Sequence, residues 1–231
     1  MEKVILTLWA QSDGDGLRNA LLENAVPRIL ASAGVHSLRL AVSDSAVEPA
    51  ADKRMSSAGE LPVAVVSVWL DQAAQVEAVV GLLAANVDAI HAYLVTEAEP
   101  IVNTQYPADA SGRVAGFCQV VFLRIPQRLS REEWLSVWLG SHTSVAIETQ
   151  STFAYRQNVV ARSLSPEAPA IDAVVEECFP LAAMSSALAF YDAADEAELQ
   201  ARLTTMMEST ARFIDFHEID VIPMSEYLFK A

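Results

Sequence analysis

Residues 117–142, FCQVVFLRIPQRLSREEWLSVWLGSH, contain a β-strand signal followed directly by a helix signal. Apolar and β-branched residues fill Phe117–Ile125, and Pro126 interrupts the run, which is typical of a strand and its end. Ser130 with Glu133 three residues later is a capping-box pattern, and it predicts a helix from there to about Glu148. A strand joined to a helix by a short loop indicates a mixed α and β protein.

The signals after this stretch complete a β-α-β-β-α-β order. Strands are predicted over Thr152–Ser163 and Ile171–Phe179, a long helix over Asp195–Asp215, and a last strand over His217–Ile222, with Glu226–Phe229 as its extension.

The first hundred residues show the same order of elements. Strand signals cover Lys3–Ala10, Val35–Val42, Leu61–Leu70 and Ala89–Val95, and helix signals cover Leu17–Ala33 and Asp71–Asn86. Residues 43–60 are rich in Ser, Ala, Pro and Gly and predict a surface loop. The chain is therefore predicted to contain a degenerate N-terminal repeat at 1–100, a linker at 101–112 and a C-terminal repeat at 113–231.

A βαββαβ unit covers one face of its sheet with helices and leaves the other face bare. Two such units in one chain can cover their bare faces against each other, which explains why stretches such as Val63–Leu70 are nearly continuously apolar. We therefore predict an α+β fold in which two βαββαβ repeats pack sheet to sheet.

The composition excludes several classes of protein. Of the 231 residues 52% are hydrophobic and 19% charged, so the chain is too apolar to be disordered. The net charge of −15, without a local cluster of Lys or Arg, argues against nucleic acid and anionic membranes as partners. No apolar run approaches the ~20 residues that span a bilayer. Val4–Ala10 is followed by no small-residue cleavage site, which favours a first strand and a cytoplasmic protein.

The helix after Ser130 carries the main candidate for chemistry. Trp134, Trp138 and His142 recur every four residues and fall within an arc of about 80°, so one imidazole projects from an aromatic helical face that packs on the sheet. Burial should lower the pKa of His142 from ~6.5 and leave a neutral imidazole able to act as a general base. The alternative is a core histidine hydrogen-bonded to a backbone carbonyl.

The following strand is unusually polar. Phe153, Tyr155 and Gln157 alternate with Ala154, Arg156 and Asn158, and a central strand rarely carries so many polar groups unless a ligand needs them. An edge strand with one wet face is the alternative. His217, Glu218 and Asp220 lack the paired spacing of metal ligands and predict a solvated strand end. Cys118 and Cys178 lie in apolar runs, which favours buried reduced thiols.

Several short motifs together resemble the EthD-type family of dimeric α+β barrel proteins. They are Arg124-x-Pro126, Leu129-Ser130-x-Glu132-Glu133-Trp134-x3-Trp138-x3-His142, Tyr155-x-x-Asn158, Phe190-Tyr191-Asp192 and Ser209-x-x-Arg212-Phe213-Ile214-Asp215. The likeness covers residues 113–231. Residues 1–100 match only in element order, because the helix there carries Val26-Pro27-Arg28-Ile29 in place of the Trp and His pattern.

The resemblance implies a ferredoxin-like duplication that forms an α+β barrel, with a small-ligand cavity between sheet and helices in the second half only. Carried over residue by residue, it implies His142, Tyr155 and Asn158 as catalytic candidates. We expect the ligand to be walled by four aromatic residues, Trp134, Trp138, Phe153 and Tyr191. Related proteins act in pollutant degradation and in the tailoring of polyketide-like aromatics.

The first functional hypothesis is a cofactor-independent enzyme that acts on a hydrophobic aromatic or carbonyl-containing molecule by proton transfer at His142. Dehydration, cyclisation and decarboxylation all fit this description. The alternative is a non-catalytic or stress-associated protein that binds a hydrophobic ligand, and haem chemistry at His142 or His217 is a third. We predict no metal and no cofactor, and allow for a homodimer of tandem chains.

Overall fold

In the part of the chain that the structure describes, eight strands form where apolar runs occur in the sequence, and all neighbouring strands pair antiparallel in one closed barrel. The computed structural model describes residues 1–57 and 59–230, so Ala58 of the predicted loop and Ala231 at the end of the predicted second repeat lie outside the described residues. The strands are β1 (Glu2–Trp9), β2 (Val35–Val42), β3 (Ala64–Leu70), β4 (Ala89–Ile101), β5 (Phe117–Leu123), β6 (Ala154–Ser163), β7 (Ala173–Phe179) and β8 (Asp220–Lys230).

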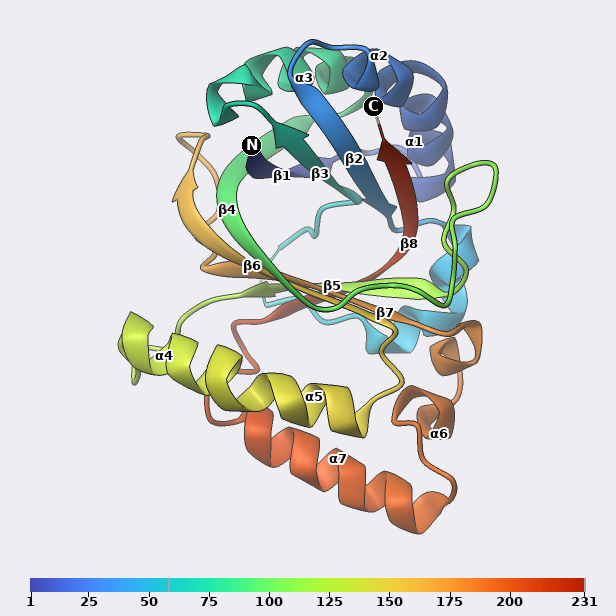
Figure 1. Ribbon diagram of the computed structural model, residues 1–231, viewed down its shortest axis with the longest axis vertical. Coiled ribbons are helices and arrows are strands. Elements are labelled where there is room, and N and C mark those ends of the chain that lie inside the picture. Colours follow the sequence, from blue (N-terminus) through green and yellow to red (C-terminus); the bar gives the residue numbers. More distant parts are fainter. Residues whose placement is uncertain (58, 231) are drawn as a thin grey trace.

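Helical segments cover the barrel at two opposite ends of the molecule (Figure 1). The first group consists of α1 (Gly14–Ala20), η1 (Leu21–Ala25), α2 (Val26–Leu30), η3 (Ala73–Gln75), α3 (Val76–Leu83) and η4 (Ala84–Asn86). The second group consists of α4 (Arg131–Val137), η5 (Trp138–His142), α5 (Thr143–Thr149), η6 (Leu181–Met184), α6 (Ala187–Phe190) and α7 (Glu196–Thr210). The segment η2 (Ser45–Lys53) connects β2 to β3.

The strand order around the barrel is β1-β3-β2-β8-β5-β7-β6-β4. The first four strands therefore run β4-β1-β3-β2 and the last four run β8-β5-β7-β6, which is the same relative order. The pairs β2–β8 and β4–β6 close the barrel between the two sets. The mixed α+β class is confirmed, with a closed antiparallel barrel as its centre.

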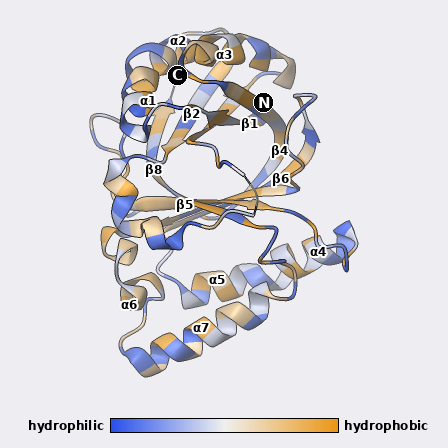
Figure 2. Ribbon diagram, turned by 180° about the vertical axis from the view of Figure 1, so that it is seen from behind, coloured by the Kyte–Doolittle hydropathy of each residue, from blue (hydrophilic) through white to orange (hydrophobic). Residues whose placement is uncertain are grey.

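Both faces of the barrel wall are covered, which explains the continuous apolar strands. Outward residues of β1–β4 pack with the first helices in one cluster that includes Val4, Leu6 and Leu8. Outward residues of β5–β8 pack with the second group of helices around Trp134 and Trp138. In Figure 2, helices α5 and α7 carry both hydrophilic and hydrophobic residues, whereas β5 is mostly hydrophobic.

Three segments differ in kind from the sequence prediction, beyond shifts of a few residues at element ends. Strand β4 continues to Ile101, because its first part pairs with β1 and its second part with β6. The predicted loop 43–60 contains the 3₁₀ helix η2, which buries Val47 and Ala50. The last strand is one continuous element from Asp220 to Lys230. The proposed division at 1–100, 101–112 and 113–231 stays a prediction. Within residues 1–57 and 59–230, no helix has the length and apolar character needed to cross a membrane.

Candidate functional site

A cavity of about 320 Å³ lies between the outward face of β5–β8 and the second group of helices. Its walls are mostly apolar and aromatic. They are formed by Val121, Leu123, Trp138, Val175, Ala187, Phe190, Tyr191, Met206, Phe213, Ile214, Phe216, Ile219 and Val221. The polar residues that line it are Lys53, Gln119, His142, Gln150, Tyr155, Glu177 and Thr210. This volume is at the lower end of the range for small-molecule sites.

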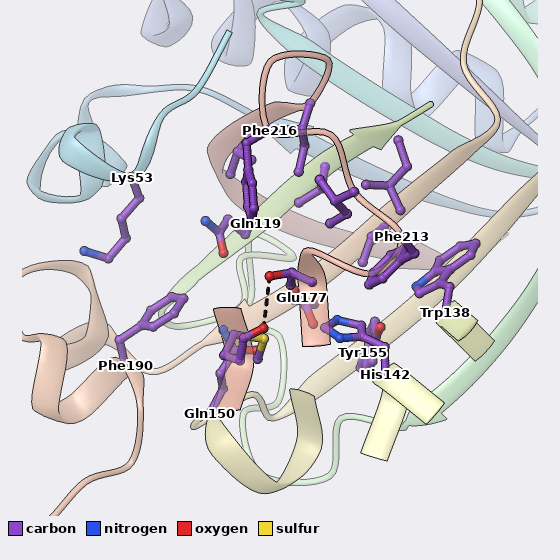
Figure 3. Close-up of a pocket in the computed structure, with 18 of the residues that line it drawn as sticks. Lys53, Gln119, Trp138, His142, Gln150, Tyr155, Glu177, Phe190, Phe213 and Phe216 are labelled. Atoms are coloured by element: carbon purple, nitrogen blue, oxygen red, sulfur yellow. Dashed lines mark hydrogen bonds between the residues drawn. The ribbon is translucent and has the colours of Figure 1, made fainter. Parts of the chain in front are cut away.

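Three of the polar side chains come from neighbouring strands in one row. Gln119 on β5 lies opposite Glu177 on β7, and Glu177 lies opposite Tyr155 on β6. Residues paired in this way across antiparallel strands have Cβ atoms roughly 5 Å apart on the same face. Figure 3 shows Glu177 and Gln119 directed into the cavity, with Tyr155 beside His142. The sheet therefore provides a polar floor in an otherwise apolar site.

His142 comes from the helix that covers this floor. The chain makes a π-helical turn from Trp138 to His142, between α4 and α5, and such turns are frequent at functional sites. The imidazole is only 6% exposed, and its Nδ1 lies 2.9 Å from the hydroxyl of Ser209 on α7. The ring also packs against Phe213, with 4.6 Å between ring centroids. Neighbours on α7 and in the turn after it thus fix the imidazole in place.

Burial changes the acid–base properties of His142 and Glu177 in opposite directions. It lowers the pKa of His142 to about 4, and the positive charge of Arg212 adds to this shift. Burial also raises the pKa of Glu177 to about 7, because few groups around its carboxylate replace the lost water. No ion pair includes Glu177 within the part of the chain that the structure describes. A carboxyl group that titrates near neutral pH in a cavity is well suited to proton transfer.

Tyr155 is held by a short polar chain. Its hydroxyl oxygen accepts a hydrogen bond of 3.0 Å from Nε2 of Gln157, which also donates to Oγ1 of Thr143 at 2.8 Å. The side chain is 1% exposed, and burial raises the pKa of its phenol well above the usual value. Tyr155 therefore stays neutral and can donate its proton to an oxygen atom in the cavity.

The structure brings together only some of the predicted site residues. His142, Tyr155, Trp138 and Tyr191 line the cavity, and their roles stay a prediction. Trp134 lies behind Trp138, at 4.9 Å between ring centroids, and its Nε1 donates to the carbonyl oxygen of Phe213. It supports the wall without lining it.

The expectation that all seven candidate site residues share one cavity is wrong for Asn158 and Phe153, which lie inside the barrel. Asn158 is three positions from Tyr155 on the same strand, so its side chain points into the barrel, where it accepts a hydrogen bond from Lys3 and donates one to Glu176. Phe153 belongs to the cluster inside the barrel and packs on Tyr106, with 4.3 Å between ring centroids.

Glu177 is the main site residue that the sequence prediction missed. The available signal was the pair Glu176-Glu177 inside the apolar strand Ala173–Phe179. Because adjacent strand residues point to opposite faces, one glutamate enters the barrel and the other enters the cavity. Lys53 was also missed, because residues 43–60 are remote in sequence from the other lining residues.

Among the described residues, one group of side chains has metal-ligand chemistry, and it lies inside the barrel and not in the cavity. The ligand atoms of Cys118, Cys178 and Glu226 lie within 4.8 Å of one another. Both cysteines are free and buried, and burial raises the pKa of each thiol. Glu226 already holds Arg156 through its Oε1, at 2.5 Å from Nη1. The group therefore consists of two thiols that stay protonated at neutral pH and a carboxylate that already pairs with an arginine.

Neither candidate histidine suits a haem iron. His217 lies in the turn before β8 and is exposed, and it does not line the cavity. His142 keeps its Nε2 available because only Nδ1 is engaged by Ser209, but the cavity of about 320 Å³ is small for a porphyrin.

The comparison with known protein families gives a match within the second half of the chain. Residues 126–217 match the model of the EthD domain family, which confirms the resemblance to EthD-type proteins for that part of the chain. No curated protein matches.

Two solved structures share the fold over nearly the whole chain. One is an anthrone oxidase-like protein, with a TM-score of 0.57 at 10% identity, covering 98% of this chain and 93% of its own. The other is a protein from Fusobacterium nucleatum subsp. nucleatum that carries the provisional name monooxygenase. It has a TM-score of 0.55 at 8% identity, covering 99% of this chain and 93% of its own. At these identities the likeness concerns the fold alone.

Proposed function

We propose that this chain, whose residues 126–217 match the EthD domain, is a cofactor-independent enzyme that moves protons on a hydrophobic aromatic or carbonyl-containing small molecule. The observation that carries this proposal is the row Gln119, Glu177 and Tyr155 facing His142 in a cavity with apolar walls. Proton removal next to a carbonyl group requires a base, a hydrogen-bond donor for the enolate oxygen and little water.

Glu177 has the properties of the base in this scheme. A general base works best when its pKa lies near the working pH, and burial brings the pKa of Glu177 to about 7. Its carboxylate takes a proton from the carbon next to the substrate carbonyl, and the electron pair of the C–H bond moves towards the carbonyl oxygen. Protonated Glu177 then returns the proton to the same or another substrate atom.

His142 and Tyr155 then act at the substrate oxygen. Tyr155 accepts from Gln157 and so keeps its own proton for donation to an enolate. His142 stays neutral at physiological pH, because burial lowers its pKa to about 4. A neutral imidazole placed by Ser209 can exchange a proton with the same oxygen through Nε2. Dehydration and cyclisation begin with this removal of a proton, whereas decarboxylation reaches the same enolate by loss of CO₂ and needs only the donor to the oxygen and the proton that returns to carbon.

The test uses 2-tetralone, an aromatic ketone with acidic C–H groups, in D₂O. The wild-type protein should accelerate deuterium uptake at the carbon next to the carbonyl, as measured by NMR. Glu177→Gln should lower the rate of deuterium uptake at least about 100-fold, and His142→Asn should lower it less. Glu208→Gln changes an exposed carboxylate of α7 and serves as the control.

A non-catalytic protein that binds a hydrophobic ligand is the second candidate, and the apolar walls of the cavity favour it. The two candidates are separated by measuring 2-tetralone binding through tryptophan fluorescence in the same samples. Binding without any accelerated exchange, in the wild type as in Glu177→Gln, would contradict the enzymatic proposal and leave the binding role.

We also propose that the two halves are ferredoxin-like repeats. Their strand orders agree, and the first helix of each half is interrupted by a π-helical turn, Leu21–Ala25 in one and Trp138–His142 in the other. The pairing of two such chains in a homodimer and a cytoplasmic location stay predictions, which sedimentation and cell fractionation can test.

A further inference from the structure

Lys53 is the one lysine or arginine among the residues that line the cavity in the described part of the chain. It ends η2, in the first half, whereas the other lining residues come from the second half. Figure 3 shows Lys53 at the edge of the site, on the side of Phe190 and away from His142 and Tyr155. The cavity therefore has a cation at its rim and the carboxyl group of Glu177 in its floor.

The position of Lys53 is fixed on both sides along the chain. Before it, η2 buries Val47 and Ala50 in a cluster with Phe117, Phe179 and Phe190. After it, residue 55 forms a two-way backbone bridge to residue 221 on β8, with N···O distances of 3.0 and 2.9 Å. The backbone at Lys53 is thus anchored to the elements that build the cavity.

Within residues 1–57 and 59–230, the ammonium group of Lys53 has only weak partners. Its Nζ lies 3.3 Å from a carboxylate oxygen of the adjacent Asp52, whose side chain is 75% exposed to water. It also lies 5.6 Å from the centre of the Phe190 ring, a cation–π arrangement that keeps it over the aromatic wall. The Lys53 side chain itself is only 16% exposed, so a ligand anion would meet a cation that is partly shielded from water.

We infer that the ligand of this cavity is an aromatic molecule with an anionic group such as a carboxylate, and that Lys53 binds this group at the rim. The inference rests on the proposed function only in taking this cavity as the ligand site. An anionic group is repelled from the floor, where Glu177 ionises, and is attracted to the rim. The ligand is thereby oriented with its ring between the aromatic walls and its reacting carbon next to Glu177 and His142.

Because the protein as a whole is strongly acidic, Lys53 matters for the binding of an anionic ligand. A net charge of −15 repels anionic molecules in general, so an anionic ligand needs a local cation at its site. A partly desolvated ion pair of this kind should contribute about tenfold to affinity. Lys53 therefore acts as a specificity-determining residue and not as a proton carrier.

The test compares two probes of the same size, 2-naphthoate and 2-acetylnaphthalene, which differ in that a methyl group replaces one carboxylate oxygen. Binding is measured by isothermal titration calorimetry at pH 8. The wild type should bind 2-naphthoate more tightly than the neutral ketone. Lys53→Met should weaken the binding of 2-naphthoate about tenfold and leave the binding of 2-acetylnaphthalene nearly unchanged. Lys53→Arg should retain the preference for 2-naphthoate. Lys230→Met, at the distant end of β8, is the control.

The salt dependence of the Lys53→Met effect gives a second measurement. Added NaCl screens both the attraction to Lys53 and the repulsion by the net charge of −15, so the difference in 2-naphthoate affinity between the wild type and Lys53→Met isolates Lys53. This difference should shrink between 50 and 500 mM NaCl, while the ketone should show no such difference. Equal affinities for the two probes, no binding of either, or an unchanged preference in Lys53→Met would overturn the inference. None of these results depends on catalysis, so a protein that prefers 2-naphthoate but exchanges no protons would contradict the proposed function alone.

Discussion

Glu177 and His142 face the same cavity, but burial moves their pKa values apart, to about 7 and about 4. Between pH 4.5 and 7 the folded chain keeps a proton on Glu177 that the unfolded chain has released, so Glu177 lowers stability as the pH rises through this window. His142 has the opposite effect between pH 4 and 6.5, where only the unfolded chain is protonated. The two effects oppose each other, and a variant of one residue separates them.

We expect Glu177→Gln to raise the free energy of unfolding at pH 8 by up to about 3 kcal/mol, because it removes a carboxylate whose ionisation is disfavoured in the folded state. At pH 4 the variant and the wild type should be almost equally stable, since Glu177 is then protonated in the folded chain. Urea unfolding at the two pH values measures the difference, with Glu208→Gln as the exposed control. A gain of the same size at both pH values would show that Glu177 does not titrate near neutrality.

At this scale the sequence predicted some site residues well and others poorly. The helical spacing of Trp138 and His142 was sufficient to place both on the buried face, and the low pKa of His142 follows from that burial. Asn158 was assigned by resemblance, although the alternation of its strand already placed it opposite Tyr155. Glu177 was missed because an alternating pattern does not reveal which of two adjacent glutamates faces a void.

At the scale of elements, the pairing of β5 with β7 includes a close approach between the start of β5 and the end of β7. Gly116 precedes β5 with a φ of +99°, and a Cβ atom there would collide with the carbonyl oxygen of Phe179 at the end of β7. We expect Gly116→Ala to lower the free energy of unfolding by on the order of 2 kcal/mol, because both the backbone conformation and the space favour glycine. Chemical denaturation measures the loss.

Gly140→Ala is the matched control for this prediction. Gly140 is an exposed residue of the π-helical turn, and nothing lies within 4 Å of the Cβ atom that alanine would add. Alanine has the higher helix propensity, so this variant should be as stable as the wild type or slightly more stable. Similar losses in both variants would contradict the close approach of β5 and β7.

Element types were predictable from the sequence, whereas their junctions were not. Periodicity and caps identified the strands and the helix that Ser130 begins, and the capping box is present as expected. The π-helical turns and the 3₁₀ helix η2 have no periodic signal of their own, because packing against distant residues stabilises them. For the same reason Lys53 was left in a surface loop.

For the whole molecule, the closure of the barrel places charges from both halves in its interior. Glu176 on β7 contacts Lys3 on β1 at 3.3 Å and Arg39 on β2 at 3.0 Å. Arg156 on β6 pairs with Glu226 on β8, which lies 3.6 Å from Arg39. The sequence predicted that two sheets cover each other but not this network, since partners such as Lys3 and Glu176 are 173 residues apart. The charges of one half are thus compensated by the other.

Glu176 should therefore be a residue on which the joining of the two halves depends. Removing one partner of a buried ion pair leaves the other charge uncompensated, so we expect Glu176→Gln to lower the free energy of unfolding by about 3–5 kcal/mol at pH 7. Glu99→Gln is the matched control, because the Glu99 side chain is 33% exposed and its partner Arg156 keeps the ion pair with Glu226. This variant should lower the free energy of unfolding by about 1 kcal/mol or less. Urea unfolding measures both. Equal losses in the two variants would mean that water already screens the interior charges, and the halves would then be held together by backbone pairing and apolar contacts alone.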